Sequence, residues 1–222
     1  MKNIHIVYSE KYPAYYALAA IEGISGMCDL AQIEYKVPLV ELNAAETKNI
    51  EDAFYNKRNG KYNEQPFFQN VLPALYNWLG LKGDGSSSII YLLEGDLYHY
   101  AGKGRPYYNW VFGAANIYGG IEAPYRIERR FKAEPAKARA EIFKTLVMHE
   151  IGHTLGLVPE SAPSHTRSKK PLFHHHCRHS YCTMSQVVSL AELKRNTDER
   201  LARQSPLCPD CLKYMIEANR TR

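Results

Sequence analysis

The stretch HEIGHTLG, residues 149–156, has the spacing of a metal-binding helix that ends at a glycine. Residues four apart on an α-helix lie one above the other, so the imidazoles of His149 and His153 can reach the same ion. Glu150 is rotated about 100° around the helix axis from His149, so its carboxylate can flank the ion without binding it. Gly156 ends the helix where the chain must turn back to supply a further ligand. The stretch therefore predicts two metal ligands with a base beside them.

The residues before this stretch predict a long helix with one apolar face. We expect it to begin at Glu134-Pro135, because proline is tolerated in the first turn of a helix, and to reach Leu155. Ile142 and Leu146 lie on the same face as the two histidines. The side of the helix that packs against the core therefore continues into the side that carries the ligands.

A second stretch, PLFHHHCRHSYCTM, covers residues 171–184 and holds four histidines and two cysteines. A tetrahedral ion held by two imidazoles needs further ligands from outside the helix, and this stretch can supply one. The sequence leaves several histidines open for that role. They are His165, His174, His175 and His176.

The cysteines are concentrated near the C-terminus, where four of the five lie and where two form a Cys-x-x-Cys pair. In a reducing compartment such a group more often binds a metal than forms disulfides. We therefore predict a closed, structural zinc site. Its ligands are Cys177, Cys182, Cys208 and Cys211, whereas Cys28 is expected to be an isolated buried thiol.

Together these motifs resemble those of the archaemetzincins, a family of zinc peptidases in the metzincin clan. The family pattern is HExxHxxG, a third His directly before a Cys, a Cys-x-Met and a closing CxxC. Here it reads HEIGHTLG, then HC at 176–177, CTM at 182–184 and CPDC at 208–211. The segment at 109–127, NWVFGAANIYGGIEAPYRI, is also similar to the family segment upstream of the helix. The resemblance covers roughly the second half of the chain.

The resemblance implies an enzyme, a zinc metallopeptidase that hydrolyses peptide bonds. His176 would join His149 and His153 as the third ligand of a catalytic zinc, and Glu150 would be the general base acting on a zinc-bound water. Met184 would lie in a turn beneath this zinc as a hydrophobic floor. The four cysteines would hold a second, structural zinc, so that each chain binds two zinc ions.

Two loop lengths depart from the family pattern. Residues 157–175 look like an insertion between the helix and the third histidine, and the segment between Met184 and Cys208 is longer than usual. Longer loops cost little free energy if their ends still meet, and neither change removes a ligand. Gln186 stands where some metzincins carry an additional tyrosine ligand.

The first part of the chain has a strand–helix–strand pattern. Residues 3–8 alternate like a strand, 10–27 have helical spacing, and 32–42 read as a strand interrupted by Pro38. We therefore predict an α/β (α+β), metzincin-like fold of two lobes. An N-terminal mixed-sheet lobe, 1–156, would carry the active-site helix. A smaller C-terminal lobe, 157–222, would be stabilised by the four-cysteine zinc site.

The composition limits the possible partners. A hydrophobic content of 45% and a charged content of 23% are typical of a globular protein. The net charge of +5 falls short of a nucleic-acid footprint. No apolar run is long enough to span a bilayer, and the start lacks the apolar core of a signal peptide, so we expect a cytoplasmic protein. The expected partner is a peptide or protein substrate, paired with an edge strand within 116–125.

Two other functions fit parts of the pattern. A zinc-binding interaction module could use the four cysteines, the basic run at 167–170 and the basic tail to hold nucleic acid or a protein. A four-cysteine site has no need of HExxH, however, which argues against this interpretation. An inactive relative of a peptidase would bind zinc without turnover, and the retained Glu150 argues against that alternative.

Overall fold

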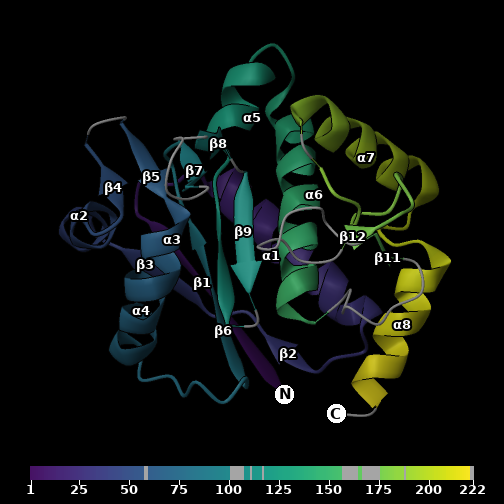
Figure 1. Ribbon diagram of the computed structural model, residues 1–222, viewed down its shortest axis with the longest axis horizontal. Coiled ribbons are helices and arrows are strands. Elements are labelled where there is room, and N and C mark those ends of the chain that lie inside the picture. Colours follow the sequence, from purple (N-terminus) through teal and green to yellow (C-terminus); the bar gives the residue numbers. More distant parts are fainter. Residues whose placement is uncertain are drawn as a thin grey trace.

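The structure is a computed structural model of the 222-residue chain (Figure 1). It describes residues 1–57, 60–100, 108–110, 112–116, 118–156, 165–166, 176–187 and 189–220. Within these ranges no helix is both long enough and apolar enough to cross a membrane.

A mixed six-stranded sheet forms the middle layer of the molecule (Figure 1). Its strands are β1 (Lys2–Ser9), β2 (Tyr35–Lys36), β3 (Leu39–Leu42), β6 (Ser87–Leu92), β9 (Gly113–Asn116) and β10 (Gly119–Glu122). The main path runs β2–β1–β6–β10–β9, and β3 also pairs with β1. All pairs are parallel except the antiparallel pair of β9 and β10.

The expected strand at 32–42 is present as two short strands, β2 and β3, separated at Val37-Pro38. Both pair with β1, which confirms the expected strand at 3–8. The range 116–125 was the expected edge of the sheet, and this is wrong for most of its length. It contains β10, which is hydrogen-bonded on one side to β6 and on the other to β9. Among the described strands, the edge on this side of the sheet is β9, Gly113–Asn116, and β2 ends the path on the other side.

Helices cover both faces of the sheet (Figure 1). On one face lie α1 (Ala14–Leu30) and α6 (Ala136–Thr154); on the other lie α2 (Ala44–Asp52) and α4 (Leu72–Trp78). The central strand β6 is buried throughout, and its side chains alternate between the two cores. Ile90 and Leu92 join the core beneath α1 and α6, whereas Ile89 and Tyr91 join the core beneath α4. The chain is therefore a mixed α/β fold in three layers.

Two prolines set the starts of the helices on the first face. Pro13 precedes α1 in an extended conformation, so this helix begins at Ala14 rather than at Glu10. Pro135 is extended as well, with ψ of 149°, and α6 begins at Ala136. At its other end, Gly156 takes a left-handed φ of +74° and donates its N–H to the carbonyl of His153. The predicted helix and its glycine stop are confirmed.

The C-terminal part packs against α6. It contains two helices, α7 (Leu190–Arg203) and α8 (Pro209–Arg220), and a two-stranded ribbon of β11 (His165–Thr166) and β12 (His176–Cys177). A buried hydrogen bond of 3.0 Å joins the hydroxyls of Thr197 on α7 and Thr145 on α6. The core beneath α1 and α6 continues into this part of the chain through Cys182, Met184 and Leu193. The division into lobes at residue 156 stays a prediction.

A smaller sheet lies beside the main one. Its strands, in spatial order, are β4 (Tyr55–Asn56), β5 (Lys61–Asn63), β7 (Leu97–Tyr100) and β8 (Tyr108–Trp110). The short helices α3 (Glu64–Pro66) and α5 (Tyr125–Arg130) follow β5 and β10 in the chain, and a π-helical turn at Phe67–Val71 joins α3 to α4.

Candidate metal centres

The last turns of α6 bring two imidazoles together. His149 and His153 lie four residues apart, with ring centroids 4.7 Å apart and their Nε2 atoms 3.1 Å apart. His153 is buried and His149 is half-buried. The neighbouring residues of the same helix, Ile142 and Leu146, are buried in the core and fix the position of the helix on the sheet.

The tautomer of His149 is set by a backbone contact. Its Nδ1 lies 2.7 Å from the carbonyl oxygen of Thr183, and a carbonyl can only accept. Nδ1 must therefore carry the proton, which leaves the lone pair on Nε2, the atom that faces His153. Thr183 is itself held in place, because its N–H donates to the carbonyl of Pro206 at 2.8 Å. A histidine oriented through its outer nitrogen in this way has the typical surroundings of a metal ligand.

A third imidazole, that of His176 on β12, completes the cluster. Its ring lies 5.3 Å from those of His149 and His153, nearly parallel to the first and perpendicular to the second. One ring nitrogen from each histidine lies within 4.8 Å of the others. The competing candidates His174 and His175 lie outside the described residues, as does the side chain of His165, although the backbone of His165 pairs with that of Cys177.

The spacing of these nitrogens suits a tetrahedral ion. Zinc–nitrogen bonds of 2.0–2.1 Å in a tetrahedron place two nitrogens about 3.3 Å apart. The observed separation of the Nε2 atoms of His149 and His153 is 3.1 Å. Three neutral imidazoles also match the donor preference of zinc, so the residues present fit the ion implied by the sequence.

Glu150 lies beside the histidine cluster and is buried, with 8% of its surface exposed. Burial, with a smaller contribution from the charge of Glu64, raises the pKa of Glu150 to about 8. Its Cγ lies next to Gly113, the first residue of the edge strand β9. The predicted base is therefore on the sheet side of the helix, within the same region as the three imidazoles.

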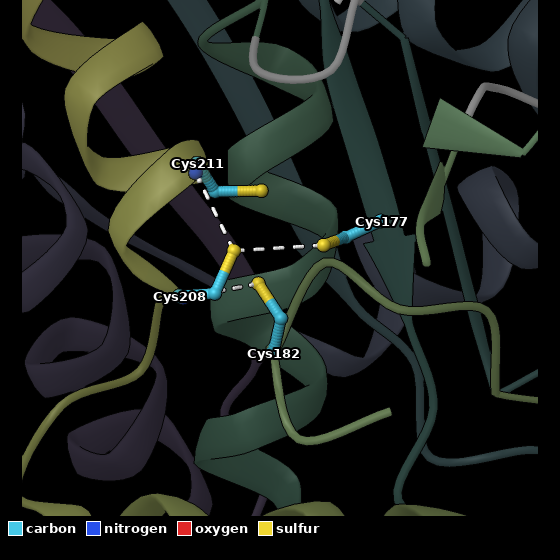
Figure 2. Close-up of side chains that lie close together, drawn as sticks. All are labelled: Cys177, Cys182, Cys208 and Cys211. Carbon is cyan, nitrogen blue, oxygen red and sulfur yellow. Dashed lines mark hydrogen bonds between the residues drawn. The ribbon is translucent and has the colours of Figure 1, made fainter. Parts of the chain in front are cut away.

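Four thiols form a second cluster, in which the sulfurs converge on one point (Figure 2). They belong to Cys177, Cys182, Cys208 and Cys211, all of which are buried. Their Sγ atoms lie within 4.8 Å of one another, and those of Cys177 and Cys208 are 3.6 Å apart. Zinc–sulfur bonds of 2.3 Å in a tetrahedron place sulfurs about 3.8 Å apart, so this cluster also fits zinc. None of the cysteines is in a disulfide.

Backbone N–H groups surround these sulfurs. The N–H of His179 points to Cys177, that of Cys208 to Cys182, and that of Cys211 to Cys208, each at 3.4 Å. Such N–H donors favour the thiolate, which is the form that binds metal. Hydrogen bonds among the thiols lower the pKa of Cys177 and Cys208 and raise the pKa of Cys182 and Cys211. Cys28 is buried in the main core, as expected of an isolated thiol.

The two clusters are joined through one short segment. His176 and Cys177 are consecutive, and the N–H of Cys177 donates to the carbonyl of Met184 at 2.8 Å. Met184 is fully buried in the core that contains α6 and the cysteines. The residue expected at the floor of the histidine site is therefore tied to the cysteine cluster by the backbone.

Reading the sequence did not identify two features of the histidine site. One is the carbonyl of Thr183, which no side-chain motif can reveal. The other is Glu122, a fully buried carboxyl close to Glu150. The sequence does carry a sign of Glu122, because a single carboxyl ends the stretch GGIE at 119–122. A strand in the middle of a sheet would bury that carboxyl, which is unusual for a glutamate.

The chain is therefore a mixed α/β protein that carries the donor groups for two metal ions. Its fold is similar to that of the crystal structure of an archaemetzincin from Methanopyrus kandleri. The TM-score is 0.66 and the sequence identity is 21%, and the match covers 100% of this chain and 96% of the other. The expected resemblance to archaemetzincins is thus confirmed at the level of the fold. No protein-family model and no curated sequence matches the chain.

Proposed function

We propose that the chain is a zinc-dependent peptidase with a metzincin-like arrangement of two lobes, 1–156 and 157–222. The observation that carries this proposal is the convergence of His149, His153 and His176 beside a buried carboxyl, Glu150. This is a set of three neutral donors and one base, which is the constellation that metal-assisted hydrolysis requires.

Zinc bound by three imidazoles supplies a Lewis acid with one open position, which polarises a carbonyl and makes water more acidic. The chain supplies the remaining parts of the reaction. The carbonyl of Thr183 keeps His149 in the tautomer that can bind the ion. Glu150 accepts the proton of the attacking water and then delivers it to the nitrogen of the leaving amine.

The peptide substrate is proposed to lie along β9, the edge of the main sheet. β9 lies beside α6, and its first residue, Gly113, borders Glu150. An extended peptide that adds to this edge would pass the histidine cluster with its backbone held by main-chain hydrogen bonds. Side-chain pockets would then set any preference for particular residues.

The four cysteines are proposed to hold a structural zinc. Four buried thiolates close the coordination sphere of a tetrahedral ion, so this site has no position for a substrate. Its role would be to fix the segment that carries both His176 and Met184. The competing function, an interaction module held by this zinc, would have no use for the histidine cluster.

The test is metal content measured together with peptide hydrolysis. Wild-type protein should contain two zinc ions and release new amino groups from reduced casein. His176→Ala should contain one zinc and no activity. Glu150→Gln should keep both zinc ions and lose about 10²- to 10⁴-fold in turnover. His179→Ala is the matched control, because this half-buried histidine of the same segment pairs through its side chain with Asp210 outside both clusters.

Unchanged hydrolysis by Glu150→Gln would contradict its role as the base. One zinc in wild type, lost only when a cysteine is replaced, would favour the interaction module. Two zinc ions without hydrolysis of any substrate would favour an inactive relative.

A further inference from the structure

Glu122 is a carboxyl buried without an obvious structural reason. It is the last residue of β10 and is 0% exposed. Neither of its oxygens has a hydrogen-bond partner among the residues that the structure describes. Burying a carboxyl in this way costs free energy, so a role other than stability has to explain its presence.

Its surroundings place it close to Glu150. Glu122 pairs with Gly113 across the antiparallel strands β10 and β9. A Cβ atom added to Gly113 would collide with Oε2 of Glu122 and would stand 3.1 Å from Cγ of Glu150. The two glutamate side chains thus approach the same point, and the absence of a side chain at Gly113 leaves that point open.

The charges around Glu122 favour its neutral form. Burial raises the pKa of Glu122 well above its usual range, and the charge of Glu150 raises it further. Among the described residues, the buried Tyr12 also senses Glu122, because its own pKa is raised by burial and then by Glu122. No described cation takes part in the shift of Glu122. Two carboxyl groups can share a hydrogen bond when at least one of them carries a proton.

We propose that Glu122 is a positioning residue for Glu150, which it orients through a hydrogen bond between the two carboxyl groups across the space left open at Gly113. This inference rests on the proposed peptidase function. The terminal torsion of a glutamate turns over a broad range at little cost, so the O–H can be directed towards Glu150. Hydrogen bonds of catalytic groups are often long in the free enzyme and tighten when the substrate is bound. Holding the base in one orientation leaves the substrate contacts unchanged and affects turnover.

The main test replaces Glu122 by residues of similar size. Glu122→Met removes the donor and should lower kcat about tenfold, with KM and both zinc ions unchanged. The same variant should raise Tm by about 2 to 4 °C, because it removes a buried polar group that has no partner. Glu122→Gln keeps an N–H donor and should restore most of the kcat lost in Glu122→Met.

A matched control is available in Tyr12→Phe. The hydroxyl of Tyr12 is also buried and without a hydrogen-bond partner in the described chain. Its removal should stabilise the fold in the same way, yet kcat should stay at the wild-type value. A purely structural role for Glu122 would give the opposite pattern, with a lower Tm in Glu122→Met. That result, or an unchanged kcat in this variant, would overturn the inference.

A second readout does not depend on hydrolysis. The unfolding free energies of Glu122→Met, Glu150→Gln and the double variant form a thermodynamic cycle. Contact between the two carboxyls predicts that the two effects are not additive, and additive effects would overturn the inference. If wild type is inactive, the proposed function fails while this cycle still tests the contact. If wild type is active and Glu150→Gln is not, a normal kcat in Glu122→Met overturns only the role of Glu122.

Discussion

The histidine cluster and the cysteine cluster are presented by the same short segment, yet they differ in how completely they are closed. All four cysteines are buried and converge on one point, which leaves no face for another ligand. The histidine cluster has three donors, one of them half-buried, and a carboxyl beside it. If the proposed roles are correct, the number and exposure of the donors separate a supporting site from a reactive one, even when both suit the same ion.

The two clusters also differ in what holds the donors in place. Three backbone N–H groups point at the sulfurs, and this arrangement stabilises negative charge. The histidines have the reverse arrangement, because the carbonyl of Thr183 accepts from Nδ1 of His149 and so leaves Nε2 directed towards the other imidazoles. A cluster that suits thiolates and a cluster that suits imidazole nitrogens thus use opposite groups of the backbone.

The largest effect is expected from breaking the closed site. Cys208→Ala should remove one zinc and lower the unfolding free energy by at least about 4 kcal/mol, because metal binding contributes directly to folding. Hydrolysis should fall as well, although no ligand of the histidine site has been changed. Thermal unfolding, zinc content and peptidase activity check this. Cys28→Ala, which removes a buried thiol outside the cluster, should keep both zinc ions and cost about 1 kcal/mol. Full activity in Cys208→Ala would show that the two sites are independent.

Breaking the open site should separate activity from stability. His153→Ala should lose one zinc and all measurable hydrolysis, while the unfolding free energy changes by about 1 kcal/mol. The physical reason is that α6 is held by its apolar core and its contacts with α7, not by the imidazoles. Metal analysis and urea unfolding measure both quantities. A loss of stability as large as that of Cys208→Ala would mean that the histidine site also supports the fold.

The pH dependence of stability is a smaller effect that also distinguishes the two clusters. It depends on Glu122, which lies near Glu150 and so near the histidine cluster. The folded pKa of Glu122 is raised above the ordinary value of 4.5, so the folded state binds a proton that the unfolded state has released. Wild type should therefore lose stability relative to Glu122→Gln as pH rises above 4.5, by up to about 1.4 kcal/mol per pH unit. Urea unfolding of both proteins between pH 5 and 8 measures the difference. If the difference in unfolding free energy does not vary with pH, Glu122 has the same protonation state in the folded and unfolded protein, which would contradict the raised pKa.

Much of the candidate site could be predicted because its donors follow short-range rules. Helix geometry alone predicts that His149 and His153 lie together. The preference of glycine for a left-handed conformation predicts the end of the helix at Gly156, where the structure shows that conformation. The choice of His176 required the family pattern, since spacing alone left several histidines open. The structure brings His176 into the cluster, and its role as a ligand remains a proposal.

The features that escaped prediction depend on long-range pairing. Whether β10 is an edge strand is decided by β6, which lies far away in the sequence, so the range 116–125 was misjudged. The same pairing buries Glu122, whose sequence neighbours give no sign that it lies near Glu150 of α6. The contact of Thr183 with His149 joins a turn to a helix 34 residues away. Local periodicity carries no information about such distances.

Consecutive residues of a strand point in opposite directions, and β12 consists of only His176 and Cys177. A single peptide bond therefore separates a donor of the histidine cluster from a donor of the cysteine cluster. If both clusters bind zinc as proposed, the ion held by the cysteines would fix β12 and so place His176 opposite α6. Formation of the histidine site would then depend on the cysteine site, and not the reverse. Loss of the ion held by the histidines alone would leave the chain folded but inactive.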